Sequence, residues 1–319
     1  MTTGTVELPI VFLMGPTASG KSELAMDLCE HFPFDIVSVD SAMVYRGLDI
    51  GTAKPTAEVL ARYPHRLIDI CEPTEVYSAG DFRRDALAEI NNIHQRGRVP
   101  LLVGGTGLYF RALETGIANL PAADTGIRKR LLEEAASNGW QVLHDRLREV
   151  DADSAERIHP NDPQRIQRAL EVYELSGKPL SSFFKEAGQH SLEAPLRKIA
   201  LAPGDRKVLH ERIRLRFEQM MEFGLLEEVK ALYRRQDLSA ASPSMKTVGY
   251  RQVWQYLEGQ LSLAEMREKA VVATRQLAKR QFTWLRSEQD IQWIDCQEAD
   301  FRAKVLRFLM NDPMLKASV

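Results

Sequence analysis

A single eight-residue motif restricts the possible folds of this chain more than any other feature. Residues 15–22 read GPTASGKS and match G-x-x-x-x-G-K-[ST] at every fixed position. The motif follows a short apolar run at 10–14 and precedes apolar residues at helical spacing, which stop near Pro33. In that setting the glycines let successive backbone N–H groups point at a phosphate, and the positive end of the helix adds to the field. The sequence therefore predicts a loop, between a strand and a helix, that binds a diphosphate or a triphosphate.

The side chains of this loop supply charge and a metal ligand. Lys21 is expected to bridge two phosphates, and the Ser22 hydroxyl is expected to bind Mg²⁺. The phosphate-binding residues predicted from the motif are Gly15, Thr17, Ala18, Ser19, Gly20, Lys21 and Ser22.

Strands and helices alternate in the first third of the chain. Apolar runs at 35–39 and 99–103 predict further strands, and apolar side chains at helical spacing between Ser78 and Gly97 predict a helix. Such alternation is typical of a parallel sheet covered by helices on both faces, with ligands at the carboxyl ends of the strands. We therefore predict an α/β fold with a P-loop NTPase-like parallel sheet core.

Two polar residues follow the expected strands at that edge. Asp40 comes directly after the run 35–39, where its carboxylate could accept a proton, bind a water of Mg²⁺ or cap the next segment. Thr106 lies in a second glycine turn, GGTG, where its hydroxyl could reach a phosphate or belong only to a tight turn. Position alone leaves the alternatives for Asp40 open, whereas for Thr106 it favours the tight turn.

The character of the sequence changes after about residue 120. Strand signals disappear from 121 to 195, and an apolar segment at 199–201 predicts a return to the sheet. We expect a core of 1–120 and 196–319, with a basic helical C-terminal part, and a helical insertion domain at 121–195 that contacts tRNA if the chain acts on RNA. The expected helices of these regions lie at 128–136, 140–150, 163–175, 205–236, 247–258 and 262–286.

Composition and charge exclude several other classes of protein. Hydrophobic residues make up 44% and charged residues 27%, which excludes a disordered chain, collagen and a coiled-coil rod. Three separated cysteines form neither a disulfide framework nor a zinc site, and no targeting or membrane-spanning segment is visible, so we expect a reducing, cytoplasmic location. The net charge is −2, but residues 196–286 carry 18 Lys and Arg against 10 Asp and Glu, a balance of +8. Charge alone favours solvated helix faces over a polyanion-binding surface there.

Six stretches together resemble one known family. They are 15–22 (GPTASGKS), 40–55 (DSAMVYRGLDIGTAKP), 104–109 (GGTGLY), 161–172 (NDPQRIQRALEV), 248–251 (VGYR) and 274–281 (TRQLAKRQ). The chain resembles the tRNA dimethylallyltransferases, also called tRNA isopentenyltransferases. The resemblance covers nearly the whole chain, and the second and last stretches are its most specific parts.

The resemblance implies transfer of a dimethylallyl group from dimethylallyl diphosphate to N6 of the adenosine 3′-adjacent to the anticodon in tRNA, a reaction of the EC 2.5.1.75 type. The loop would then hold the diphosphate of the donor instead of ATP, with Mg²⁺ as cofactor. Asp40 would take the proton from N6, Thr106 would lie near the reacting groups, and Arg216 would be a further diphosphate contact. The adenosine would be flipped out of the anticodon loop. Separately from the resemblance, we expect a monomer without a membrane partner.

The same resemblance implies which residues line the path of the tRNA. The expected tRNA-binding residues are Asp40, Ser41, Ala42, Met43, Thr106, Arg128, Gln164, Arg165, Ile166, Gln167, Arg168, Met245, Lys246, Thr247, Val248, Gly249, Tyr250, Arg251, Ala278, Lys279, Arg280, Gln281, Phe282, Thr283, Trp284 and Leu285.

Three alternative functions stay open on the sequence. A P-loop small-molecule kinase would also place a proton-accepting Asp after the second strand, but it leaves the basic C-terminal half without a role. An isopentenyltransferase could act on free adenine nucleotides, although the helical insertion and the long basic helices favour a macromolecular acceptor. A non-catalytic RNA-binding protein with a regulatory nucleotide site is the third alternative.

Overall fold

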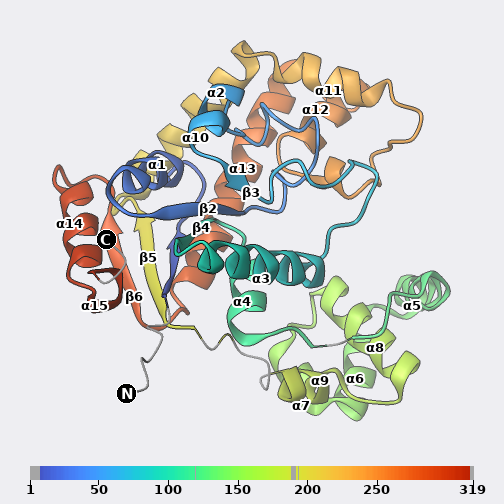
Figure 1. The fold of residues 1–319 in the computed structure, drawn as a ribbon. Coiled ribbons are helices and arrows are strands. Elements are labelled where there is room, and N and C mark those ends of the chain that lie inside the picture. The colour runs from blue at the N-terminus through green and yellow to red at the C-terminus, as the bar shows by residue number, and fades with distance from the viewer. Residues whose placement is uncertain (1–7, 119, 188–191, 193, 317–319) are drawn as a thin grey trace, which may run out of the picture. The chain divides into compact units, whose positions relative to one another are not determined.

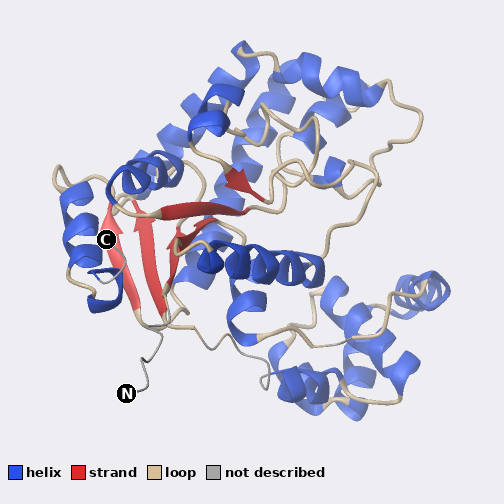
Figure 2. Cartoon of the chain, in the orientation of Figure 1, coloured by secondary structure: helices blue, strands red, loops and turns tan. Residues whose placement is uncertain are grey.

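The chain folds into two compact units. The computed structural model describes residues 8–118, 120–187, 192 and 194–316, and Figures 1 and 2 show its helices and strands. One unit consists of Met1–Phe110 together with Glu193–Val319, and the other of Arg111–Leu192. The boundaries expected for the insertion, 121 and 195, fall ten and three residues after those of the second unit.

Six parallel strands form the sheet of the larger unit. Their order is β3-β2-β4-β1-β5-β6, so that β1, which precedes the phosphate loop, lies between β4 and β5. The strands are β1 (Ile10–Met14), β2 (Phe34–Val39), β3 (His65–Arg66), β4 (Val99–Gly104), β5 (Leu196–Ala202) and β6 (Ile291–Asp295). The predicted α/β fold with a P-loop NTPase-like parallel sheet is confirmed. The two edge strands were not predicted, because β3 has only two residues and β6 buries only Ile294 fully.

Helices cover both faces of this sheet. Successive side chains of a strand point to opposite faces, and Val11 of β1 accordingly packs in one cluster with Leu24 and Val305. Phe12 points to the other face, where its ring centroid lies 5.0 Å from that of Phe110. The helices that supply these contacts are α1 (Lys21–His31), α14 (Phe301–Met310) and α4 (Gly107–Thr115), and α3 (Ala79–Gln95) also packs on β2 and β4.

A second hydrophobic cluster joins the helices of the C-terminal half to the segment that follows β2. It contains Leu48 and Tyr250, both without exposed surface. The helix expected over 205–236 is two helices, because Gly224, with φ +100°, ends the first and begins the second. The elements of this region and of the C-terminus are α2 (Ala57–Arg62), α10 (Arg206–Glu222), α11 (Leu225–Tyr233), a short 3₁₀ helix (Ser244–Lys246), α12 (Tyr250–Leu257), α13 (Leu263–Leu285) and α15 (Pro313–Lys316).

The described residues of the smaller unit are helical or loop. Its core is made of apolar side chains from five helices, including Leu131, Leu143, Leu147 and Leu170. The helices are α5 (Thr125–Asn138), α6 (Trp140–Val150), α7 (Ala152–Arg157), α8 (Pro163–Ser176) and α9 (Leu180–Ala187). Within the described ranges of the whole chain, no helix is long and apolar enough to cross a lipid bilayer.

Candidate active site

The loop after β1 has the geometry of a phosphate cradle. Ala18 and Gly20 have positive φ angles of 62° and 90°, which turn the backbone back on itself before α1 begins at Lys21. Gly15 lies so close to β5 that a Cβ atom there would be 2.2 Å from the Leu201 carbonyl oxygen. Lys21 Nζ donates to the Pro16 carbonyl oxygen at 2.6 Å, so the lysine folds back over its own loop.

Two cations and one carboxylate interact electrostatically at this loop. Burial lowers the pKa of Lys21 from 10.5 to about 7; the positive charge of Arg216 acts in the same direction, and Asp40 opposes it. Burial also lowers the pKa of Arg216, again against the field of Asp40. The structure thus places Lys21, Arg216 of α10 and Asp40 near one another, although they are far apart in sequence. Such a group of half-buried cations attracts an anion that can replace their lost hydration.

The two carboxylate oxygens of Asp40 have different surroundings. Its Oδ1 accepts the N–H groups of Ala42 at 2.8 Å and Met43 at 3.3 Å, which closes a turn directly after β2. No described residue donates to its Oδ2. One oxygen therefore holds the turn in place, and the other is available to a proton donor.

Thr106 connects the turn after β4 to the turn after β2. Its Oγ1 accepts the Ser41 N–H at 3.1 Å, and its own N–H donates to the Val39 carbonyl oxygen at 3.3 Å. Gly104 allows this close approach, since a Cβ there would lie 2.0 Å from the Val39 carbonyl oxygen. The hydroxyl that the sequence associates with phosphate therefore lies beside Asp40.

Two residues of α13 fit against these loops. Gln281 Oε1 accepts the Thr17 N–H at 2.9 Å, while its Nε2 donates to the Gly105 carbonyl oxygen at 3.0 Å. Trp284 covers Gly107, where a Cβ would lie 2.4 Å from the indole ring, and its ring stacks on Phe110 with 5.9 Å between the ring centroids. The described contacts of Trp284 are thus those of a packed side chain, and its contact with tRNA stays a prediction.

The segment 40–55 is held by residues that the sequence analysis did not single out. Glu228 of α11 accepts the N–H groups of Asp49, Ile50 and Gly51 at 2.7 to 3.2 Å, and it also accepts the hydroxyl proton of Tyr250. Tyr250 in turn receives the Gly51 N–H at 3.1 Å. The sequence did not distinguish Glu228 from the other acidic residues of its helix, because this contact depends on how α11 packs against the segment 40–55.

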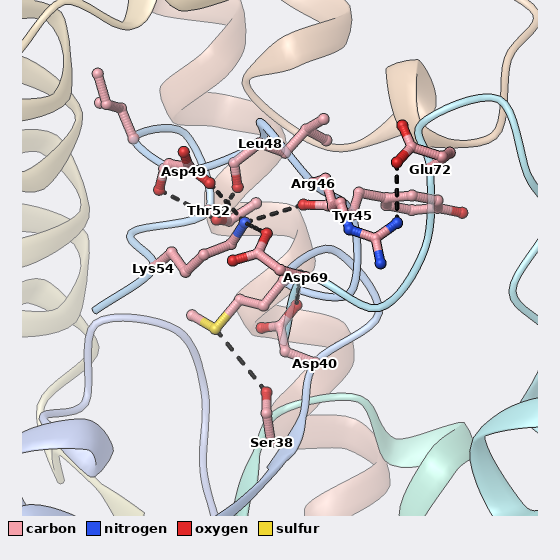
Figure 3. A network of polar contacts seen from close by, with 12 residues as sticks. Ser38, Asp40, Tyr45, Arg46, Leu48, Asp49, Thr52, Lys54, Asp69 and Glu72 are labelled. Carbon is pink, nitrogen blue, oxygen red and sulfur yellow. Dashed lines mark hydrogen bonds and ion pairs between the residues drawn. The ribbon is translucent and has the colours of Figure 1, made fainter. Parts of the chain in front are cut away.

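Lys54 fixes the same segment from its other end. Its ammonium group donates to the Tyr45 carbonyl oxygen at 2.9 Å and to the carboxylates of Asp49 and Asp69 at 2.6 and 2.5 Å, as Figure 3 shows. The Lys54 side chain is only 3% exposed, so all three of its protons are used inside the protein. In the same view Asp40 lies on the segment that this network holds.

The expected tRNA-binding residues of the larger unit include buried side chains and exposed cations. The side chains of Met245, Tyr250, Ala278 and Leu285 are buried and pack their helices together. Four cations of the same segments are exposed and form no ion pair with a described residue. These are Lys246, Arg251, Lys279 and Arg280.

In the smaller unit, one buried carboxylate orients two of the expected tRNA-binding arginines. Glu171 has no exposed surface and accepts both Nε and Nη2 of Arg128, at 2.9 and 3.2 Å, and Nη1 of Arg168 at 2.7 Å. Gln167 Nε2 donates to the Arg128 carbonyl oxygen, whereas Ile166 is part of the core. Gln164 and Arg165 are exposed at the start of α8.

The donor set at the loop fits Mg²⁺ bound chiefly by phosphate and water. Within the described ranges there is no group of three His, Cys, Asp or Glu side chains that could hold a metal by themselves. Mg²⁺ usually keeps several waters and takes one or two protein ligands beside phosphate oxygens. The exposed hydroxyl of Ser22 matches that smaller demand.

A phosphate loop after a central strand of an all-parallel sheet, with a carboxylate after β2, which is separated from β1 by β4, defines a P-loop α/β protein. The chain matches the model of the IPP transferase family over residues 43–288. It is also 57% identical to a tRNA dimethylallyltransferase of Thioalkalivibrio sulfidiphilus over 299 residues, which cover 94% of this chain and 93% of the relative. The chain therefore belongs to the tRNA dimethylallyltransferase (IPP transferase) family, the enzymes that form N6-dimethylallyladenosine in tRNA, and the resemblance found in the sequence is confirmed.

Solved structures agree with this assignment. The full-length tRNA isopentenylpyrophosphate transferase of Bacillus halodurans is 37% identical, with a TM-score of 0.71 and 98% of both chains covered. The corresponding Staphylococcus epidermidis enzyme is 34% identical, with a TM-score of 0.67 and 94% of this chain and 97% of that chain covered. A eukaryotic dimethylallyltransferase captured acting on tRNA is 26% identical, with a TM-score of 0.77 over 97% of this chain and 79% of that one.

Proposed function

We propose that this chain transfers the dimethylallyl group of dimethylallyl diphosphate to N6 of the adenosine next to the anticodon, with the diphosphate held in the loop 15–22. The observation that carries the proposal is the meeting of Lys21, Arg216 and Asp40 at this loop, in a chain of this family. The assignment to the family removes the kinase and the non-catalytic RNA-binding protein from the alternatives left by the sequence.

The cations of the site are suited to a departing diphosphate. As the bond between the allylic carbon and oxygen breaks, negative charge grows on the leaving group, and preorganised positive groups stabilise it most where water is excluded. Lys21 and Arg216 are both partly removed from water, and the loop amides add further donors. Mg²⁺, bound through Ser22 and diphosphate oxygens, would neutralise part of the same charge.

Asp40 is suited to the other half of the reaction. The lone pair of the exocyclic N6 is delocalised into the purine ring, so a base that removes its proton as the C–N bond forms lowers the barrier. The free Oδ2 of Asp40 serves as that base, while Oδ1 keeps the carboxylate oriented through Ala42 and Met43. Thr106, bonded to the adjacent Ser41, holds the same turn and lies near the reacting groups.

Exposed cations of the larger unit support binding of the acceptor RNA. Lys246, Arg251, Lys279 and Arg280 are free to meet phosphates, and their segments also contain the motifs 248–251 and 274–281. In the smaller unit, Arg128 and Arg168 keep N–H groups beyond those that Glu171 accepts. The unstacking of one adenosine costs a few kcal/mol, which such contacts offset.

A single chain supplies every residue of this proposal, so we also propose that it works as a monomer. Its three cysteines are free thiols in the structure, as suits the expected cytoplasmic location.

The decisive experiment is mass analysis of tRNA after incubation with the protein, Mg²⁺ and dimethylallyl diphosphate. We expect one added five-carbon unit on the adenosine 3′ to the anticodon, and we expect Lys21→Ala to remove it. The matched reaction with free AMP checks the alternative acceptor. Prenylation of AMP in preference to tRNA, or full activity of Lys21→Ala, would contradict the proposal.

A further inference from the structure

We propose that Gln281 sets the length of the phosphate chain that the loop accepts, so that the site admits the diphosphate of the prenyl donor and disfavours nucleoside triphosphates. The inference rests on the proposed placement of the diphosphate in the loop 15–22. It addresses a question that the motif leaves open, because G-x-x-x-x-G-K-[ST] occurs in proteins that bind triphosphates.

Gln281 is wedged between the two glycine turns of the site. It is only 8% exposed, and both ends of its amide are in use: Oε1 accepts the Thr17 N–H, and Nε2 donates to the Gly105 carbonyl oxygen. A Cβ at Gly105 would lie 2.3 Å from Gln281 Nε2 and 3.1 Å from the Gly15 carbonyl oxygen. The side-chain amide therefore fills the space between the turn after β1 and the turn after β4.

This contact changes what the phosphate loop can offer. Phosphate loops bind their ligand through successive backbone N–H groups. Here the Thr17 N–H is already directed at Gln281, so fewer donors remain for a long phosphate chain. The same contact places the negative end of the Gln281 amide dipole at the start of the loop, where it repels an additional phosphate group.

The Gln281 side chain is held in place by the packing of α13. Ala278 and Phe282 of α13 pack with Ala18 of the loop and with Leu209 and Ile213 of α10. These contacts hold Gln281 at a fixed distance from Thr17. Reorientation of this buried side chain on ligand binding would break both of its hydrogen bonds, which is energetically unfavourable.

The test measures the affinities of pyrophosphate and tripolyphosphate by isothermal titration calorimetry at constant free Mg²⁺. The variants are Gln281→Ala, which opens the gap, and Gln281→Met, which keeps most of the volume but removes both hydrogen bonds. Gln276→Ala is the matched control, because Gln276 is an exposed residue of the same helix. Melting temperatures check that each variant is folded.

We expect the wild type and Gln276→Ala to prefer pyrophosphate. In Gln281→Ala and Gln281→Met the ratio of tripolyphosphate to pyrophosphate affinity should rise at least fivefold, about the effect of one hydrogen bond made or lost. A smaller rise in folded variants would overturn the role of Gln281 and leave the proposed function intact. If pyrophosphate fails to compete with dimethylallyl diphosphate in the wild type, the placement of the diphosphate falls, and this inference falls with it. Should Gln281→Ala not fold, Gln281→Met decides alone.

Discussion

At the scale of single residues, the site depends on charges that are held partly out of water. Lys21 and Arg216 lie near the carboxylate of Asp40, and neither cation forms an ion pair with a residue that the structure describes. A half-buried cation without a partner is costly until an anion arrives. Under the proposed function, the site is therefore prepared for a diphosphate before the donor binds.

Replacement of Asp40 by Asn should lower kcat by about 10²–10⁴, the usual contribution of a general base, because the amide cannot accept the N6 proton. The Asn side-chain oxygen can still accept the Ala42 N–H, so tRNA affinity should change little. Single-turnover rates with saturating tRNA and donor measure the effect. The control is Asp145→Asn, an exposed position of α6. Turnover at the wild-type rate would remove Asp40 from the chemistry.

The lowered pKa of Lys21 predicts a pH dependence of donor binding. In the free protein Lys21 is charged below pH about 7 and neutral above it, whereas a bound diphosphate favours the charged form. Binding above pH 7 must therefore take up a proton, so the KM for the donor should rise by up to tenfold per pH unit between pH 7 and 9. Lys21→Arg keeps its charge over this range and should flatten the profile. Equal slopes in both proteins would rule out Lys21 as the titrating group.

At the scale of elements, the segment 40–55 is an irregular stretch that the surrounding helices hold in shape. Glu228 of α11 receives three of its backbone N–H groups, and Lys54 ties it to Asp69. The segment carries Asp40 at its start, so its shape affects where the proposed catalytic carboxylate lies. We interpret the specific sequence of this segment as largely a requirement of this network.

Glu228→Ala should lower the free energy of unfolding by about 2–3 kcal/mol, because it leaves backbone donors in a half-buried place without their acceptor. Tyr250→Phe, which removes a single hydroxyl, should cost about 1 kcal/mol. Urea denaturation measures both. The neighbouring Glu227→Ala, which loses only an exposed pair with Lys230, serves as control and should stay within about 0.5 kcal/mol of the wild type. Equal losses for Glu227→Ala and Glu228→Ala would show that the network is not what holds the segment.

At the scale of the whole molecule, charge is distributed unevenly along a chain that is nearly neutral. Residues 196–286 carry 18 basic against 10 acidic residues, while the net charge is −2. The structure separates these cations further, because Arg214 and Arg235 are paired with nearby carboxylates, whereas Lys279 and Arg280 are exposed and have no such partner among the described residues. A polyanion such as tRNA is attracted mainly by the unpaired cations.

Arg280→Ala should weaken tRNA binding and lower the slope of log Kd against log salt by about one, as expected for one lost phosphate contact. Arg235→Ala should leave the slope unchanged, since Arg235 is held by Asp237. Filter binding at several salt concentrations gives both slopes. A slope for Arg280→Ala equal to that of the wild type would make this residue structural.

The phosphate loop and the central strands could be predicted because the residues that define them are consecutive in the sequence. The loop 15–22 is recognised from consecutive residues, and the runs at 10–14 and 99–103 are buried on both faces of the sheet, so their apolar character shows in the sequence. Gln281 and Glu228 could not be assigned in this way. Gln281 contacts Thr17 across 264 residues, and nothing in a helical sequence reveals which turn of the helix meets a distant loop.

The amino-acid sequence by itself determined the sheet class, the phosphate loop and the family, because periodicity and contiguous motifs are properties of neighbouring residues. The tertiary structure alone decided that Lys21, Arg216 and Asp40 share one site and that Gln281 fills the gap beside it. It also decided which residues of the family motifs are exposed, and which, like Tyr250, are buried. The physical reason is that burial and electrostatic interaction depend on distances in space, and those are set only when the strands pair and the helices pack on them.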